Sequence, residues 1–581
     1  MNLRGITDRS RLSWDYIWLA IALSVGGVVY IAYLNTHTHP AYEGGLYLQI
    51  AEEIIQSNYG FPKHIPYYHE GGIPFAYPPL MFYVIAFITD FTSIDPVSLE
   101  LYIPGLVTIA YLIPYYFIAK DLLGTSRKAG IASIFFAVTP LVLRWHISAG
   151  GIVRGVAMLF TLLGIYAGLK IFRTGSRWWL LPGTVLFTLT MLTHPVYTVF
   201  YGGTYLLLFA YYNQTPRGFV NGAIVAIGGV VLTVPWWFQI ATTHGLDIYL
   251  TASGTHTGLT GGVDRILSQF IYPLWDMNMV TPFYVAAFAG GIYATLRRRY
   301  FLPVWLVLAS YVIGKDRFTF VAGSMLSAIL VVEVIIPAVS TIDINLEFDP
   351  STNRRKVIPA VLAFIFVLGA IGTGVAFAGS ELNTAHTGSS TQPQTVDNRD
   401  LQAMEWVKSN TSPEANFVVL SDAAEWVPYY TERTVIVSPW GAEWTSTAGY
   451  YEEYELYRNL GTCSNIDCLE VLLGVSQRQP DYLYISNEVY TVHGDERTPR
   501  MEMIHSMTVS DQYELQYKNR GVVVFKLTDQ PKDIQNAQST QSTQNAQDRQ
   551  KQEREQEQNT TANKTETSTS VGFSGHASDL S

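Results

Sequence analysis

The sequence has 581 residues, of which 49% are hydrophobic and only 14% are charged, and its mean hydropathy is +0.17. Soluble chains carry about 25% charged residues, so this composition excludes an ordinary soluble protein and indicates a membrane protein. The net charge of -10 lies partly in the polar C-terminal region and no basic patch is visible, so we expect no nucleic-acid partner.

The chain begins with three arginines, Arg4, Arg9 and Arg11, which precede an apolar stretch over residues 16–34. This stretch is longer than the core of a signal peptide, and no small-residue cleavage site follows it. We therefore expect an uncleaved first membrane helix with a cytoplasmic N-terminus, because basic residues beside a span stay on that side.

Further apolar stretches, each a candidate helix, recur up to about residue 380. They cover residues 78–91, 101–118, 130–143, 152–171, 179–193, 197–211, 219–238, 281–296, 301–313, 318–337 and 357–377. The positive-inside rule assigns to the cytoplasm the breaks near Lys120, Lys170, Arg217, Arg298 and Arg355. Three stretches precede Lys120, so the shortest of them, 78–91, is assigned to the outer interface. The sequence thus predicts a multi-pass cell-membrane bundle of about eleven transmembrane helices, with everything after residue 379 extracytoplasmic.

Beyond the last apolar stretch the composition becomes that of a soluble chain. Helical spacing is present at residues 398–409 and 469–475, and short β-like runs lie at residues 417–420, 435–437, 482–485 and 522–527. The polar residues from 531 onward leave too few apolar side chains to form a core. We therefore expect a membrane domain over residues 1–379, a linker over 380–397, a small extracytoplasmic α/β domain over 398–530 and a disordered tail over 531–581.

The sequence contains two cysteines, Cys463 and Cys468, both in the predicted α/β domain. Two cysteines exclude a cysteine-rich metal site or a disulfide framework and leave a single local bridge open. Because the domain should face an oxidising compartment, we predict that they form a disulfide.

The first outer loop, between residues 35 and 77, carries several short motifs. Glu43 follows the first span and is succeeded by a Tyr47-x-x-x-Ala51 helix, which we place at the membrane surface, and by a Gly60-x-Pro62 turn and Tyr77-Pro78-Pro79-Leu80. In this order the motifs resemble the C-type (GT-C) superfamily of membrane glycosyltransferases, which includes oligosaccharyltransferase catalytic subunits and protein mannosyltransferases. The resemblance covers about residues 16–337 and implies a sugar donor carried on a polyprenyl phosphate at the outer membrane face.

The second outer loop and the C-terminal domain carry related motifs. Ser148-Ala149-Gly150-Gly151 is similar to a turn that oligosaccharyltransferase subunits follow with a metal-binding carboxylate pair, whereas this chain has Val153 and Arg154. We therefore expect no metal and no other cofactor. Asp422-Ala423-Ala424-Glu425-Trp426 stands where those subunits carry their acceptor motif, so recognition of a protein glycosylation sequon is not implied.

Sugar transfer to a hydroxyl group needs a carboxylate to accept the proton and cations to stabilise the departing phosphate. Glu43 is the candidate base and Glu70 the second candidate. Arg154, Arg317 and Arg144 are candidates for binding the donor phosphate, because a guanidinium offers a planar fork of donors. The candidate carboxylates and arginines can also have purely structural roles. A loop carboxylate is most often solvated, and an arginine at the end of a span commonly reaches lipid headgroups.

The sequence therefore predicts a hexosyltransferase-like, metal-independent membrane glycosyltransferase. Its expected partners are a lipid-linked sugar donor, membrane lipids and a glycan, lipid or protein acceptor. The missing carboxylate pair keeps open a catalytically silent relative that serves as a binding or assembly protein in the cell envelope. A transporter is a third interpretation, disfavoured because the ionisable residues cluster outside the spans, with Glu333 the main exception.

Overall fold

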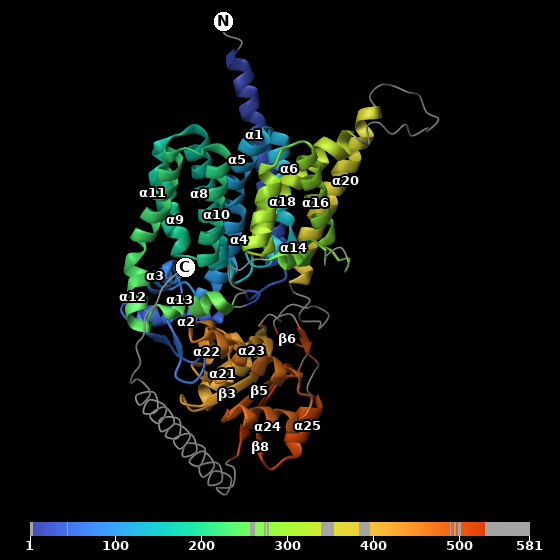
Figure 1. Ribbon diagram of the computed structural model, residues 1–581. Helices are drawn as coiled ribbons and strands as arrows, with labels where there is room; N and C mark the ends of the chain where they lie inside the picture. Colours follow the sequence, from blue (N-terminus) through green and yellow to red (C-terminus); the bar gives the residue numbers. More distant parts are fainter. Residues whose placement is uncertain are drawn as a thin grey trace, which may run out of the picture.

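The computed structural model divides into a helical bundle and a C-terminal α/β domain at one end of it (Figure 1). It describes residues 4–42, 44–255, 262–271, 275, 278–337, 354–382, 396–487, 490–492, 495–497 and 501–528. The predicted linker and tail fall largely on residues 383–395 and 529–581, which lie outside this description. The N-terminal end of α1 lies at the end of the bundle opposite the C-terminal domain (Figure 1).

The bundle is built from the predicted apolar stretches, each of which forms one or two helices. Its helices are α1 (Arg4–Leu34), α4 (Pro96–Ala110), α5 (Leu112–Leu123), α6 (Ser126–Val138), α7 (Pro140–Leu143), α8 (Gly151–Thr174), α9 (Leu180–Met191), α10 (Pro195–Tyr212), α11 (Pro216–Leu232), α12 (Val234–His244), α16 (Thr281–Leu296), α17 (Phe301–Val312), α18 (Asp316–Ile329) and α20 (Arg354–Ala376).

Two stretches that we expected to be continuous are interrupted. The stretch 101–118 is divided at Tyr111 between α4 and α5, which together still form one long apolar span. The stretch 219–238 bends by 54° between α11 and α12. Pro235 lies just after that bend, and because its nitrogen carries no hydrogen it cannot continue the hydrogen bonding of α11.

Among the described residues, four helices are long and apolar enough to cross a membrane. They are Trp14–Leu34, Pro96–Leu123, Gly151–Thr174 and Asp316–Ile335, and the bent pair α11–α12 adds a fifth if it counts as one span. Leu80–Thr92, Phe301–Val312 and Phe364–Ser380 are apolar but shorter. The total of about eleven spans therefore stays a prediction.

Basic residues from three of the breaks that we assigned to the cytoplasm form ion pairs. Lys120 pairs with Asp15 of α1, and Lys170 lies 2.6 Å from Asp121. Glu333, the one acidic residue late in a predicted span, contacts Lys128 and accepts two hydrogen bonds of 2.8 Å from Arg299. Glu333 thus neutralises basic residues at a helix end, which weakens the transporter interpretation.

The first outer loop forms its own small layer between the bundle and the C-terminal domain. It contains α2 (Gly45–Gln56), a hairpin of β1 (His64–Ile65) and β2 (Ile73–Pro74), and α3 (Leu80–Thr92). The predicted helix around Tyr47 is confirmed, and its apolar face packs against α3 and α22. Its place at the membrane surface stays a prediction. The assignment of α3 to the outer interface stays a prediction.

The C-terminal domain is an α/β domain around a five-stranded sheet of order β4-β3-β5-β9-β8. The strands are β3 (Asn416–Leu420), β4 (Thr434–Val435), β5 (Tyr482–Ser486), β8 (Tyr513–Lys518) and β9 (Val522–Leu527). Its helices are α21 (Asn398–Asn410), α22 (Trp426–Thr431), α23 (Thr447–Thr462), α24 (Ile466–Val475) and α25 (Met501–Val509). A disulfide joins Cys463 to Cys468, as the sequence predicted.

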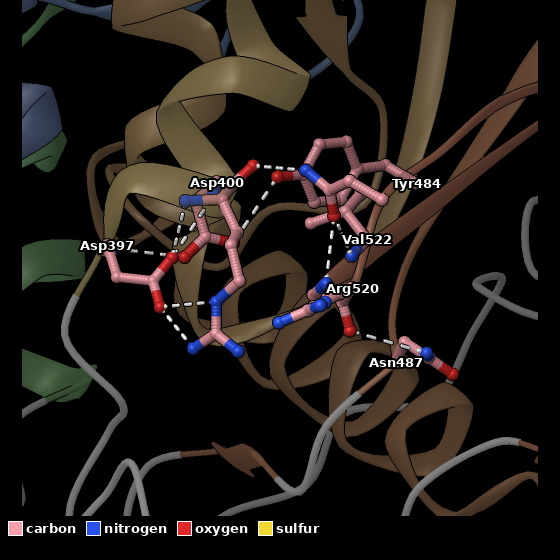
Figure 2. Close-up of polar contacts among 9 residues, drawn as sticks. Asp397, Asp400, Tyr484, Asn487, Arg520 and Val522 are labelled. Atoms are coloured by element: carbon pink, nitrogen blue, oxygen red, sulfur yellow. Dashed lines mark hydrogen bonds and ion pairs between the residues drawn. The ribbon is translucent and has the colours of Figure 1, made fainter.

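The start of α21 is fixed by a capping box and tied to the sheet (Figure 2). The Asp397 carboxylate accepts from the backbone nitrogens of Arg399 and Asp400, at 2.7 and 3.3 Å. The Tyr484 hydroxyl of β5 donates to Asp400 at 3.4 Å, and burial raises the pKa of Asp400 to about 7. These contacts position α21 across the sheet, with α22 between it and the first outer loop.

Candidate active site

Two of the outer segments that the sequence analysis singled out lie together at the end of the bundle. The backbone nitrogen of Ala149 donates to the carbonyl of Ala41 at 3.0 Å. The ring of Tyr42 packs on that of Trp145, with 5.0 Å between centroids. The first outer loop is therefore joined directly to the turn that precedes α8.

The two glycines of that turn determine where Arg154 lies. A Cβ atom at Gly150 would lie 2.0 Å from Nη1 of Arg154, so glycine leaves the space that the guanidinium occupies. A Cβ atom at Gly151 would lie 2.2 Å from the carbonyl oxygen of His146, so glycine there permits a close backbone approach. As a result Arg154 folds back over the turn, and its guanidinium stacks 4.7 Å from the centroid of the Trp145 ring.

Arg317 reaches the same place from the first turn of α18. It is buried, and its guanidinium lies 5.6 Å from the ring centroid of Tyr197. Nε2 of His146 is 2.7 Å from the Tyr197 hydroxyl. Burial, together with the charges of Arg317 and Arg154, lowers the pKa of His146 well below its usual value, so His146 is neutral. Both arginines therefore lie near one uncharged histidine.

Arg144 and Lys315 complete the positive group, and Asp316 is its nearby carboxylate. Arg144 is close enough to Asp316 for their charges to interact, and Asp316 accepts a hydrogen bond of 2.6 Å from the Tyr284 hydroxyl. The Nε atoms of Arg144 and Arg317 are buried without a hydrogen-bond partner in the part of the chain that the structure describes. We call Arg144, Arg154, Lys315 and Arg317 the basic cluster. The Nε donors of Arg144 and Arg317 suit an anionic ligand such as a phosphate.

Glu43, the candidate base, lies outside the described residues. Its neighbours Tyr42 and Gly44 are described: Tyr42 packs on Trp145, and a Cβ atom at Gly44 would lie 2.3 Å from Oε2 of Glu100. The loop on either side of Glu43 therefore adjoins the turn that carries Arg154.

Glu70, the second candidate, lies at the tip of the β1–β2 hairpin with an exposed side chain. The hairpin is attached to the C-terminal domain by His69. The backbone nitrogen of His69 donates to the carbonyl oxygen of Val435 at 3.0 Å, and Nε2 of the His69 ring lies 3.2 Å from Oε1 of Glu453. The contacts beside Glu70 thus belong to the C-terminal domain and not to the basic cluster.

Two buried glutamates beside the first outer loop were missed by the sequence analysis. Glu100 in α4 is fully buried, and among the described residues neither of its carboxylate oxygens has a hydrogen-bond partner. Glu425 of the C-terminal domain is also buried, and its Oε1 accepts from the backbone nitrogen of Leu46 at 3.3 Å. The sequence did contain a signal for Glu100, because an ionisable residue at the end of an apolar stretch is often functional. The predicted stretch 101–118 began one residue after Glu100, so this signal was not used.

The residues at the turn do not fit a metal ion. Val153 and Arg154 occupy the positions of the carboxylate pair, and a guanidinium does not ligate cations. Within the described ranges, no three His, Cys, Asp or Glu side chains gather as metal ligands would. Glu43 lies outside those ranges, so the absence of a metal stays a prediction.

Comparison with known proteins identifies the fold. No family model and no curated protein matches the sequence. The structure resembles archaeal oligosaccharyltransferase AglB from Archaeoglobus fulgidus in complex with an inhibitory peptide and a dolichol-phosphate, with TM-score 0.55 and 12% identity over 82% of this chain and 69% of that one. The apo form of the Archaeoglobus fulgidus enzyme matches with TM-score 0.52 and 13% identity over 82% and 70% of the two chains.

A second type of membrane glycosyltransferase shares the architecture. Arabinofuranosyltransferase AftD from Mycobacteria matches with TM-score 0.54 and 12% identity, over 88% of this chain and 40% of its own. These likenesses, together with the apolar helices of the bundle, lead to one conclusion about architecture. The chain is a multi-pass membrane protein with the fold of the C-type glycosyltransferases.

Proposed function

We propose that this protein is a membrane glycosyltransferase that transfers a sugar from a polyprenyl-phosphate-linked donor to an acceptor at the extracytoplasmic face. The observation that carries the proposal is the basic cluster: the buried Arg317 and the half-buried Arg144, Arg154 and Lys315, from three separate segments, lie together beside the first outer loop. Burying like charges together is costly unless an anion offsets them, so such a group marks a functional site for an anionic ligand.

The proposed reaction is a displacement at the anomeric carbon of the sugar. Glu43 accepts the proton of the acceptor hydroxyl, whose oxygen forms the new bond while the bond from the anomeric carbon to the phosphate oxygen breaks. The phosphate then gains negative charge, which Arg154, Arg317 and Arg144 stabilise through charge-assisted hydrogen bonds. Glu70 is the alternative base.

The mechanism proposed here is independent of a metal ion. Its support is the position of Arg154, whose fixed positive charge stands beside Trp145 where the related enzymes carry metal-binding carboxylates. If the guanidinium replaces the metal, activity should persist in the presence of EDTA. Loss of activity in EDTA that added Mg²⁺ or Mn²⁺ restores would contradict this part of the proposal.

The proposed orientation has a cytoplasmic N-terminus and an extracytoplasmic C-terminal domain. It is supported by the lysines and arginines in the breaks that the positive-inside rule assigns to the cytoplasm, among which Lys120, Lys128 and Lys170 form ion pairs. A protease added to intact cells should then remove residues beyond about 380. Protection of that region would overturn the orientation.

The decisive experiment incubates the purified protein with a panel of polyprenyl-phosphate sugars and measures donor consumption. Glu43→Gln should lower the transfer rate roughly 10²–10⁴-fold while donor binding is largely retained, because only proton transfer is removed. Arg154→Ala should weaken binding and turnover together, since an arginine that contacts phosphate acts on ground state and transition state alike. Glu52→Gln, on the exposed face of α2, is the matched control and should behave like the parent protein.

The outcomes separate the competing assignments. Full activity in Glu43→Gln with loss in Glu70→Gln would transfer the role of base to Glu70. If a folded protein binds a donor but consumes none, the catalytically silent relative that acts as a binding or assembly protein would become the better interpretation.

A further inference from the structure

The first turn of α2 receives its capping contact from the C-terminal domain. The residue before α2 is Gly44, which has no side chain to accept a hydrogen bond from that turn. The backbone nitrogen of Leu46 donates instead to Oε1 of the buried Glu425, at 3.3 Å. The first backbone N–H groups of a helix have no partner within it, and a side-chain oxygen commonly accepts from one of them. Glu425 therefore fills, from another domain, the role that Gly44 leaves open.

Two consecutive glycines let the C-terminal domain approach this part of the first outer loop closely. A Cβ atom at Gly45 would lie 2.5 Å from the carbonyl oxygen of Glu425, and one at Gly44 would lie 2.9 Å from the ring of Trp426. Both distances are shorter than an ordinary van der Waals contact, so a side chain at either position would push the two segments apart. Glycine is the residue that permits such an approach of one backbone to another.

Trp426 holds the chain on the other side of Glu43. Nε1 of its buried indole donates to the carbonyl oxygen of Tyr42 at 3.3 Å. Tyr42 has φ +65°, in the left-handed region that a bulky residue rarely adopts. Such a backbone conformation persists only where neighbouring contacts maintain it. The hydrogen bond from Trp426 and the contact of the Tyr42 ring with Trp145 are contacts of this kind.

Glu425 and Trp426 are themselves fixed by the first outer loop. They are consecutive residues at the junction of a short 3₁₀ helix, η5 (Asp422–Glu425), and α22. The carbonyl oxygen of Glu425 accepts from the Tyr68 hydroxyl at 2.7 Å, and the Trp426 ring meets the His39 ring edge-on, with 4.3 Å between centroids. A change in either residue should therefore move the chain that it contacts.

We propose that Glu425 and Trp426 are positioning residues for the candidate base, because they hold the chain on both sides of Glu43, at Leu46 and at Tyr42. The inference rests on the proposed function, since it assumes that Glu43 accepts the proton of the acceptor hydroxyl. It deepens that function by making the C-terminal domain a part of the catalytic machinery. Neither residue needs to touch the substrate for this role.

The test compares Trp426→Phe with the parent protein in a transfer assay and in a binding assay. The purified full-length protein in nanodiscs receives a polyprenyl-phosphate sugar that the parent protein consumes, and kcat, the KM for this donor and the affinity for polyprenyl phosphate are measured. Phenylalanine keeps an aromatic ring but removes the N–H that binds Tyr42, so kcat should fall roughly 10- to 100-fold, as expected for a misplaced catalytic group. The KM and the affinity should be unchanged, because the basic cluster is untouched.

Further variants separate positioning from general damage to the domain. Glu425→Ala should lower kcat as Trp426→Phe does, whereas Glu425→Gln should restore most of it, since an amide oxygen can still accept from Leu46. Trp406→Phe is the matched control, because the Trp406 ring stacks on that of Tyr517 in the same domain, with 5.2 Å between centroids. It should behave like the parent protein.

Combining Trp426→Phe with Glu43→Gln shows whether Trp426 acts through the base. If it does, Trp426→Phe should have no further effect on the low residual rate of Glu43→Gln, because the effects of residues that act as a unit are not additive. Losses that multiply would overturn the inference, since Trp426 would then act independently of Glu43.

The single variants distinguish failure of this inference from failure of the proposed function. If Glu43→Gln loses transfer while Trp426→Phe and Glu425→Ala keep the kcat of the parent, the inference is overturned and the proposed function stands. If Glu43→Gln retains full kcat, the proposed base is wrong and this inference falls with it. Equal losses of kcat and of affinity for polyprenyl phosphate in Trp426→Phe would show that the site had lost its fold, and would also reject the inference.

Discussion

Gly150 is the residue on which the position of Arg154 depends. A methyl group at Gly150 would collide with the end of a flexible side chain, whereas one at Gly151 would collide with the backbone carbonyl of His146. The first collision can be relieved by moving the guanidinium, while the second requires the turn itself to shift. A substitution at Gly150 should therefore affect the position of the guanidinium, whereas a substitution at Gly151 should affect the backbone of the turn.

We predict that Gly150→Ala weakens donor binding while leaving the fold intact. The displaced Arg154 loses its charge-assisted contacts, each typically 1.5–3 kcal/mol, so the dissociation constant of a polyprenyl phosphate should rise roughly 10-fold or more. Thermal unfolding should show an unchanged Tm. Gly203→Ala, where no atom lies within 4 Å of the new methyl group, should change neither quantity. A lowered Tm in Gly150→Ala would show that the turn and not the arginine had been disturbed.

At this scale the sequence revealed the residues that stand at the ends of apolar stretches. Arg144, Arg154 and Arg317 could be proposed because each stands at or near the end of an apolar stretch and a guanidinium offers a planar fork of donors to phosphate. Glu100 was missed because it lies one residue before the predicted apolar stretch 101–118, although it belongs to α4.

At the scale of elements, helix α18, which carries Asp316 and Arg317 in its first turn, packs closely on α16. A Cβ atom at Gly290 of α16 would lie 2.1 Å from the carbonyl oxygen of Leu326 in α18, so the two helices approach at backbone distance. The neighbouring Gly291 faces only a side-chain atom of Leu326, at 3.6 Å. Small residues at such crossings are typical of membrane helices that pack by van der Waals contact.

We predict that Gly290→Ala destabilises the bundle and Gly291→Ala does not. The methyl group at residue 290 must push α18 away, at a typical overpacking cost of about 1–3 kcal/mol, whereas at residue 291 it makes an ordinary contact. The Tm values of the two purified variants in the same detergent measure the difference. Equal Tm values would contradict the close approach of the two helices.

The elements found from the sequence are those with a strong pattern. Strands β3 and β9 are runs of Val, Leu and Phe, and the structure confirms both. Strand β8 has mostly half-buried or exposed side chains and helix α23 is rich in Tyr and Glu, so neither stood out from a loop. The bend between α11 and α12 was missed although Pro235 marks it, because the apolar composition continues across it.

For the whole molecule, two histidines of the first outer loop contact the C-terminal domain, and their pKa values are shifted in opposite directions. Burial lowers the pKa of His39 to about 4, and its Nε2 lies 3.0 Å from the Tyr430 hydroxyl. The hydrogen bond to Glu453 raises the pKa of His69, and Arg478 contacts the same carboxylate. No pattern in the sequence could pair these residues, because the partners are nearly 400 positions apart in the chain.

We predict that the contact of His69 with Glu453 stabilises the protein at acidic pH and that this stabilisation is lost at alkaline pH. Because the pKa of His69 is raised on folding, its contribution is fully present below about 6.5, the pKa of the unfolded state, and disappears as pH rises through the folded-state pKa. His69→Gln should lower the Tm at pH 6 by on the order of 2 °C and leave it nearly unchanged at pH 9.

The difference between variant and parent at each pH isolates His69, since His39 contributes the opposite slope to both proteins. His505→Gln, on the exposed side of α25, is the control and should follow the parent at both pH values. A Tm difference for His69→Gln that is the same at pH 6 and pH 9 would contradict the charged contact with Glu453.

The layer between bundle and domain also dictates an order of biogenesis. The Tyr68 hydroxyl donates to the carbonyl of Glu425 at 2.7 Å, across 357 positions of sequence. At about 5–20 residues per second, the ribosome needs roughly 20–70 s to supply that partner after the loop has been made. During this interval the buried Ile73 lacks its contact with Gly441 of the C-terminal domain. The nascent chain must therefore wait with an open loop, and Gly44 and Gly45, which lie against Trp426 and Glu425, can take their final positions only after the C-terminal domain has been made.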